Sequence, residues 1–186
     1  MSEQDDPRRF LAFEDKGLIL ISVAYPKMVR AIVDILTILL KEKNLSGIFI
    51  SLDRPHTYIA RILEKRGVPQ EKLTYIDTVI GISGEKSGAE DNLVQLTSPF
   101  CINILSDVFS PEFLEKRDSK PGFIIVDNLS ALRAFVPDSC IERFLKDLND
   151  VRGLLTESRC FIVMDKTACP DLYAMIKKGD VQEMEL

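Results

Sequence analysis

The segment Gly122-Phe-Ile-Ile-Val-Asp127-Asn128-Leu-Ser-Ala-Leu132 is typical of a central strand in a parallel sheet. Its apolar, largely β-branched run predicts a strand that is buried on both faces. The run stops at Asp127, which is followed by residues that favour a turn. In open parallel α/β sheets, ligands bind at the carboxyl ends of the strands. Asp127 is therefore the first candidate for a functional side chain.

Similar apolar runs recur along the chain and alternate with segments of helical periodicity. Between residues 29 and 40, for example, apolar side chains recur every three or four positions, as on one face of a helix. This alternation predicts an α/β fold built from right-handed crossovers. The predicted strands cover residues 18–23, 47–52, 73–77, 93–96, 122–126, 160–164 and 180–186, and the predicted helices cover 29–40, 54–66, 99–116, 139–155 and 170–178.

One domain accounts for all of these elements. A chain of 186 residues is long enough to bury a sizeable core without disulfides or metals. We therefore predict a single α/β domain over residues 16–186, with a mostly parallel sheet and helices on both faces. Residues 1–15 are polar at first and then apolar at Phe10, Leu11 and Phe13. They predict a loose tail that docks through its aromatic side chains, Phe10 and Phe13.

The net charge and the cysteine spacing argue against several classes of function. A net charge of −5 and a pI near 5.0 argue against partners such as nucleic acids and anionic membranes. Cys101, Cys140, Cys160 and Cys169 form no CxxC pair and no zinc-site spacing, so we interpret them as buried thiols in a reducing cytoplasm. No signal peptide or membrane-length apolar run is evident. A cytoplasmic protein is expected.

Acidic residues end four of the predicted strands, at Asp53, Asp77, Asp127 and Asp165. Parallel strands place their carboxyl ends along one edge, where such acids can hold Mg²⁺ or polarise a water molecule. The alternative for each acid is that it caps a turn or the following helix. His56, the only histidine, lies near the same edge and is expected on the surface at a helix start. A shallow polar cleft is predicted there.

The turn after the first predicted strand lacks a phosphate-binding loop. A P-loop reads G-x-x-x-x-G-K-[ST], and its backbone N–H groups converge on a phosphate. Here the turn is Ala24-Tyr25-Pro26-Lys27-Met28, which has no glycine and no hydroxyl. Lys27, at the helix start, is the residue of this turn that can attract an anion. The glycine-rich run at residues 81–88 has the wrong spacing and is interpreted as a flexible loop.

The segments at residues 18–23, 47–53 and 122–132 together resemble the RecA superfamily, and specifically the KaiC-like ATPases of archaea and bacteria. The resemblance runs over nearly the whole chain. It implies a RecA-like fold in which Asp127, at the Walker B-like position, supports the Mg²⁺ of bound ATP. The family has a pair of glutamates after its second strand, one of them the catalytic base, where this chain has Asp53-Arg54. The chain is thus similar to degenerate archaeal-type relatives without a P-loop.

Two functions follow from this resemblance as expectations. The first is a non-catalytic regulatory or scaffolding protein that acts through protein contacts in signalling, with no cofactor. Its partner is another protein or a second copy, and a dimer is expected rather than a hexamer because hexamers of the family place ATP between subunits. The alternative is a nucleotide-binding protein or weak ATPase that binds ATP and Mg²⁺. In that case Asp127, Lys27 and Asp53 form the cofactor site, and Asp127 is the Mg²⁺ ligand.

Overall fold

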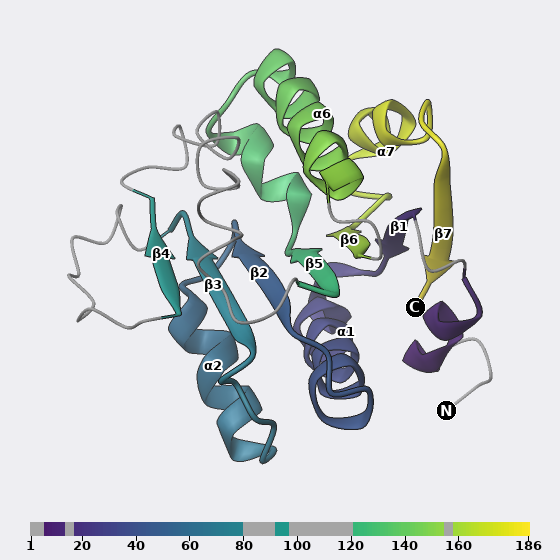
Figure 1. Cartoon of the computed structure of the whole chain (residues 1–186). Coiled ribbons are helices and arrows are strands. Elements are labelled where there is room, and N and C mark those ends of the chain that lie inside the picture. The colour runs from purple at the N-terminus through teal and green to yellow at the C-terminus, as the bar shows by residue number, and fades with distance from the viewer. Residues whose placement is uncertain (1–5, 14–16, 80–91, 97–120, 155–157) are drawn as a thin grey trace.

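The computed structural model describes residues 6–13, 17–79, 92–96, 121–154 and 158–186 (Figure 1). Its strands are β1 (Gly17–Ser22), β2 (Gly47–Ser51), β3 (Leu73–Asp77), β4 (Leu93–Gln95), β5 (Phe123–Val126), β6 (Arg159–Met164) and β7 (Val181–Glu185). Its helices are the 3₁₀-helix η2 (Pro7–Ala12), α1 (Tyr25–Thr37), the π-helix η3 (Ile38–Glu42), α2 (His56–Lys65), the 3₁₀-helix η5 (Leu129–Ala134), α6 (Asp138–Leu154) and α7 (Pro170–Ile176).

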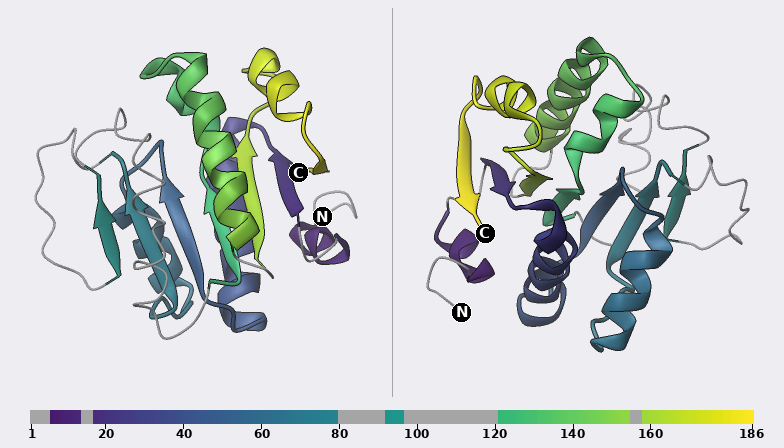
Figure 2. Two further views of the ribbon diagram at one scale, coloured as in Figure 1. Left: turned by 45° about the horizontal axis from the view of Figure 1, so that its top comes forward. Right: turned by 180° about the vertical axis from the view of Figure 1, so that it is seen from behind.

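These strands form one seven-stranded sheet in the order β4-β3-β2-β5-β6-β1-β7. Every neighbouring pair is parallel, so the predicted α/β class and parallel sheet are confirmed. Helices α1 and α2 cover one face, and α6 and α7 cover the other, as Figure 2 shows. Neighbouring strands β2 and β5 are therefore followed by helices on opposite faces, and so are β1 and β6. Ligand sites of open α/β sheets lie at such points.

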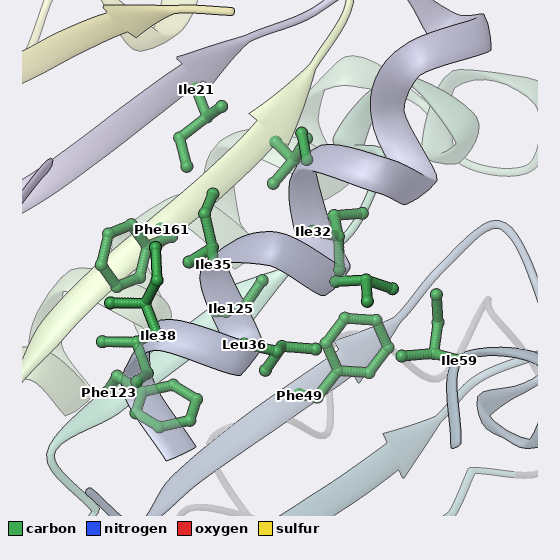
Figure 3. Close-up of a cluster of buried hydrophobic side chains, with 14 of the residues drawn as sticks. Ile21, Ile32, Ile35, Leu36, Ile38, Phe49, Ile59, Phe123, Ile125 and Phe161 are labelled. Carbon is green, nitrogen blue, oxygen red and sulfur yellow. The ribbon is translucent and has the colours of Figure 1, made fainter. Parts of the chain in front are cut away.

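Two apolar cores fill the space between the sheet and its helices. In the core under α1 and α2, Ile32 and Leu36 of α1 pack against strand side chains such as Phe49 and Phe161 (Figure 3). The opposite core joins β-strand side chains to Phe144 and other residues of α6, η5 and α7. Full burial of such a side chain stabilises the fold by roughly 1.5–3 kcal/mol. Together the two cores hold the strands in place, and with them the carboxyl edge of the sheet where the acids lie.

The N-terminal segment packs against the domain. Phe10 of η2 is fully buried, and its ring meets Phe161 edge-on with 5.2 Å between ring centroids. Asp6 caps η2 by accepting the Arg8 backbone N–H at 2.9 Å. The predicted docking through Phe10 is thus present in the structure.

Several element boundaries differ from those predicted. Helix α1 begins at Tyr25, four residues before the periodic pattern, because Pro26 fits the first turn of a helix. It continues into a π-helical turn at Ile38–Glu42. Gly67 follows α2 with a φ of 62°, the left-handed conformation expected at its position. The predicted helix at 99–116, with Cys101, and the glycine-rich run at 81–88 lie outside the described residues.

Gly47 lies under the ring of Phe123, its register partner on β5. A Cβ atom there would lie 2.2 Å from Phe123 Cζ, and that ring is fully buried. Gly47→Ala should therefore lower the free energy of unfolding by about 1–3 kcal/mol in chemical denaturation, because the ring has to move within a packed core. Gly17→Ala is the control, since its Cβ would meet Gln182 Nε2 at an ordinary 3.5 Å. Equal effects of the two substitutions would contradict this account.

Candidate functional site

The carboxyl edge of the sheet gathers the strand-end acids, as predicted. Asp77 ends β3, and Asp53, Asp127 and Asp165 lie just beyond β2, β5 and β6. Because β2 pairs with both β3 and β5, the first three acids lie around the end of β2. Asp165 lies beside the end of β1, since β6 pairs with β1.

Asp127 is buried and holds the turn that follows β2. Its side chain accepts the backbone N–H groups of Leu52 and Asp53. Only 1% of the residue is exposed. Burial raises the pKa of Asp127 to about 8; the Leu52 hydrogen bond lowers it, and the nearby Asp53 carboxylate raises it. At neutral pH this carboxyl group is therefore mostly protonated, which is the wrong state for binding Mg²⁺.

Asp53 forms an ion pair with the residue that follows it. Arg54 Nη1 lies 2.7 Å from Asp53 Oδ2, and the two side chains are 21% and 17% exposed. The Arg54 guanidinium also lies over the ring of Tyr25 at the start of α1, 5.0 Å from its centroid. This cation–π contact links the turn after β2 to the turn after β1.

Asp165 occupies the N-terminus of α1. Its Oδ2 accepts the Tyr25 backbone N–H at 3.1 Å, and its Oδ1 accepts the Thr167 hydroxyl at 2.6 Å. The Thr167 hydroxyl is the largest cause that lowers the pKa of Asp165, and the Tyr25 N–H adds to it. Within the same helical turn Pro26 has no N–H, and Lys27 donates its N–H to Ala24 O at 2.9 Å. The first turn of α1 is thus held by groups of this chain.

Asp77 and His56 form a buried pair, which the sequence alone does not predict. His56 Nδ1 lies 2.7 Å from Asp77 Oδ2, and both side chains are at most 2% exposed. The same oxygen accepts the His56 backbone N–H at the start of α2 at 2.6 Å, and Oδ1 accepts the Val79 N–H at 2.7 Å. The expected surface position of His56 is wrong, because the register of β3 against β2 places Asp77 beside the start of α2.

One rule describes three of these acids. Asp77, Asp127 and Asp165 each accept a backbone N–H from the turn after a neighbouring strand, as their bonds to His56, Leu52 and Tyr25 show. His56 and Asp127 are each 1% exposed, so neither lines the shallow cleft that was predicted. The acids therefore stabilise the strand-to-helix turns in this structure.

Lys27, in the first turn of α1, is exposed. Its side chain lines a hollow of about 150 Å³ together with Pro7, Arg30 and Asp34, among others, and none of the four strand-end acids lines that hollow. The described parts of the chain contain no group of three or more His, Cys, Asp or Glu residues arranged to hold a metal ion. The described helices include none with the length and apolarity needed to span a bilayer.

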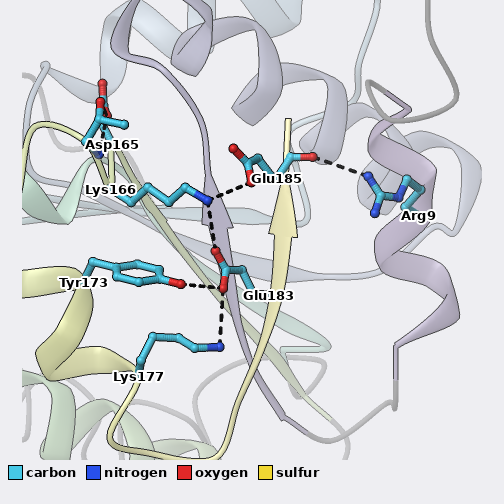
Figure 4. Close-up of polar contacts among 8 residues, drawn as sticks. Arg9, Asp165, Lys166, Tyr173, Lys177, Glu183 and Glu185 are labelled. Carbon is cyan, nitrogen blue, oxygen red and sulfur yellow. Dashed lines mark hydrogen bonds and ion pairs between the residues drawn. The ribbon is translucent and has the colours of Figure 1, made fainter. Parts of the chain in front are cut away.

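A second polar cluster joins α7 and the loop after β6 to the edge strand β7. Lys166 Nζ lies 2.7 Å from Glu185 Oε2 and 3.7 Å from Glu183 Oε1 (Figure 4). The Tyr173 hydroxyl donates to Glu183 at 2.8 Å, and Lys177 pairs with the same carboxylate. Burial raises the pKa of Glu183, but the bonds from Tyr173 and Lys177 outweigh it, so that pKa is lowered. The opposite charges balance, which is typical of a structural network.

Comparisons with known proteins identify the fold. No protein-family model matches the sequence, and no curated protein does. Among solved structures, the KaiC-like protein PH0186 of the archaeon Pyrococcus horikoshii superposes with a TM-score of 0.60 at 14% identity, over 93% of this chain and 74% of that one. The fold is RecA/KaiC-like. The uncharacterised protein PH0321 of the same organism, solved with an unknown peptide, superposes with a TM-score of 0.63 at 17% identity, over 95% of this chain and 80% of that one.

Two turns follow central strands of this fold. The turn at Ala24–Met28 follows β1, and Asp127 follows β5. Both lie at points where neighbouring strands lead to helices on opposite faces. The residues at those points hold one another, through Asp165 with Tyr25 and Asp127 with Leu52.

Proposed function

We propose that this chain is a non-catalytic RecA/KaiC-like protein with a regulatory or scaffolding role, acting through protein contacts in signalling. The observation that carries the proposal is the occupied start of α1. A phosphate at a helix N-terminus needs converging N–H groups and a positive local field. Here the Tyr25 N–H points at the Asp165 carboxylate, and Pro26 has none.

The residues of this turn therefore do not fit a nucleotide phosphate. A phosphate near Tyr25 would meet the negative charge of Asp165, whose pKa is lowered so that the carboxylate persists in acid. Lys27 alone supplies a point charge on an exposed side chain, without the backbone cradle that orients a phosphoryl group. Electrostatic repulsion and the missing donors both disfavour phosphate binding.

The state of Asp127 supports the same proposal, because this side chain is poorly suited to bind Mg²⁺. A Walker B-like acid has to be ionised and open towards the nucleotide to support Mg²⁺. Asp127 is 1% exposed and its pKa is about 8. The alternative function, ATP and Mg²⁺ bound through Asp127, Lys27 and Asp53, would require these side chains to leave their present partners.

The surface offers candidate contacts for a protein partner. Tyr25, Tyr58 and Phe135 are 49%, 48% and 41% exposed. Aromatic residues are enriched at protein interfaces. The similar structure of PH0321 was solved in complex with a peptide, which is consistent with a peptide-binding use of this fold. Self-association as a dimer belongs to the same proposal and would use such surfaces.

Mg²⁺–ATP should produce neither turnover nor binding. We expect phosphate release at the background rate and no shift in melting temperature at millimolar ATP, because Asp165 occupies the start of α1 and Asp127 is buried against the Leu52 N–H. Malachite-green detection of phosphate and differential scanning fluorimetry measure the two quantities. Turnover that Asp127→Ala abolishes would establish the alternative function instead. The control is Asp150→Ala, at an exposed position of α6.

A further inference from the structure

Two exposed tyrosines mark the surface where α1 and α2 begin. Tyr25 opens α1 and Tyr58 lies in the first turn of α2, and about half of each side chain is exposed. The two helices cover the same face of the sheet (Figure 1). The Arg54 guanidinium lies over the Tyr25 ring, and Pro55, which follows Arg54 in the sequence, directly precedes α2. Tyrosine and arginine are the residue types that dominate binding energy at interfaces.

This surface continues into an open groove along the outer side of α2. The groove has a volume of about 420 Å³. Half-buried Ile62 gives it an apolar part, and Tyr58 adds an aromatic ring. Its lining consists of Pro55, Thr57, Tyr58, Arg61, Ile62 and Lys65. We call these six residues the α2 groove.

The charge of the α2 groove is opposite to that of the protein. The whole chain carries −5, whereas the groove is lined by the cations Arg61 and Lys65 and by no acid among the described residues. Both cations are exposed, and neither forms an ion pair with any residue of the described ranges. Glu64 is exposed on the same helix but does not line the groove. A local positive patch attracts acidic partners and sets their orientation.

We propose that the α2 groove binds an acidic peptide segment of a partner protein, with one apolar side chain against Tyr58 and Ile62 and flanking carboxylates at Arg61 and Lys65. This rests on the proposed function and names the chemistry of its partner. Carboxylates suit the two cations, and an apolar residue suits the tyrosine ring. A polyanion such as DNA or an anionic bilayer needs several phosphate contacts, and the net charge of −5 opposes it.

Fluorescence anisotropy with a defined probe tests this inference. The probe is a fluorescein-labelled 12-residue peptide of Asp and Glu around one central Leu, and the comparison peptide carries Lys in place of each acid. We expect saturable binding of the acidic peptide, at least tenfold weaker binding of the basic one, and further weakening as salt rises from 50 to 300 mM. Absence of binding, or equal binding of both peptides, would overturn the inference.

Charge-reversed variants locate the binding surface. The variant Arg61→Glu/Lys65→Glu should weaken binding of the acidic peptide at least tenfold, and Tyr58→Ala several-fold. The matched control is Arg143→Glu/Lys146→Glu, which reverses one arginine and one lysine exposed on α6, across the sheet. It should change binding less than twofold. All of the changed side chains except that of Tyr58 are exposed cations, so unchanged circular dichroism and melting temperature are expected and checked first.

Two outcomes separate the alternatives. Equal losses in the α2 and α6 variants would show that binding follows net charge alone and would overturn the α2 groove. Binding to phosphatidylserine vesicles that Arg61→Glu/Lys65→Glu abolishes, without acidic-peptide binding, would overturn the peptide assignment in favour of a membrane. The Mg²⁺–ATP assays report separately on the non-catalytic proposal, so failure of peptide binding leaves that proposal standing.

Discussion

Asp77→Ala should lower the free energy of unfolding by about 2–6 kcal/mol, because the His56 backbone N–H and the His56 ring each lose a buried hydrogen-bond partner at about 1–3 kcal/mol apiece. The substitution removes the acceptor of the His56 backbone N–H and the partner of the His56 ring, both in a site with at most 2% exposure. Buried donors that lose their acceptor keep the full cost of lost hydration. Urea denaturation followed by circular dichroism measures the change.

Two further variants make the Asp77 result specific. Asp77→Asn retains an acceptor oxygen and should cost less than the alanine variant. Asp171→Ala, at the start of α7 with a side chain that is 86% exposed, should change stability by no more than about 0.5 kcal/mol. A double-mutant cycle with His56→Ala should give a coupling energy above about 1 kcal/mol. A loss at Asp77 no larger than that at Asp171 would refute the structural role of the pair.

Asp127→Asn should change how stability depends on pH. The pKa of Asp127 is about 8 in the folded protein against an ordinary 3.8, so between about pH 4 and 8 the folded state binds more protons than the unfolded state. The Asp127 contribution is therefore largest below pH 4 and is lost as pH rises to 8. The loss is at most about 1.4 kcal/mol per pH unit, on the order of 5 kcal/mol in total.

The difference between wild type and Asp127→Asn isolates this contribution, because acids with lowered pKa, such as Asp165, titrate in both proteins. Asparagine mimics the neutral carboxyl and still offers an oxygen to the Leu52 N–H. Measured in urea at several pH values, the variant should gain stability relative to wild type as pH rises, most clearly from pH 5 to 7. Asp150→Asn, on the exposed side of α6, is the control. Parallel curves for wild type and Asp127→Asn would contradict the raised pKa.

The strands could be predicted from the sequence because each signal is local. A strand buried on both faces needs an unbroken apolar run such as Phe123–Val126, and an edge strand such as Val181–Glu185 shows alternation instead. The class of the fold and the common edge of the acids follow from those runs. The RecA/KaiC-like fold agrees with the resemblance of residues 18–23, 47–53 and 122–132 to that family.

The partners of the acids could not be predicted, because they depend on which strands are neighbours. Tyr25 and Asp165 are 140 positions apart and meet only because β6 lies beside β1. His56 and Asp77 meet through the register of β3 against β2. The sequence contains the acids and the turns, but the strand order decides which acid reaches which turn. The capping alternative weighed for each acid describes Asp77, Asp127 and Asp165 best.

The Asp165–Tyr25 contact has a consequence for how such a protein could change during evolution or redesign. Rewriting residues 24–28 as a glycine-rich P-loop would leave Asp165, just beyond β6, facing the new loop, since it belongs to a different segment of the chain. Freeing the Asp127 carboxylate to bind a metal ion would in turn require it to release the turn at Leu52. Under the proposed non-catalytic function, gaining a nucleotide site would therefore take coordinated substitutions in at least two segments of the chain, because each alone removes a contact that the present structure uses. Such a path would pass through less stable intermediates.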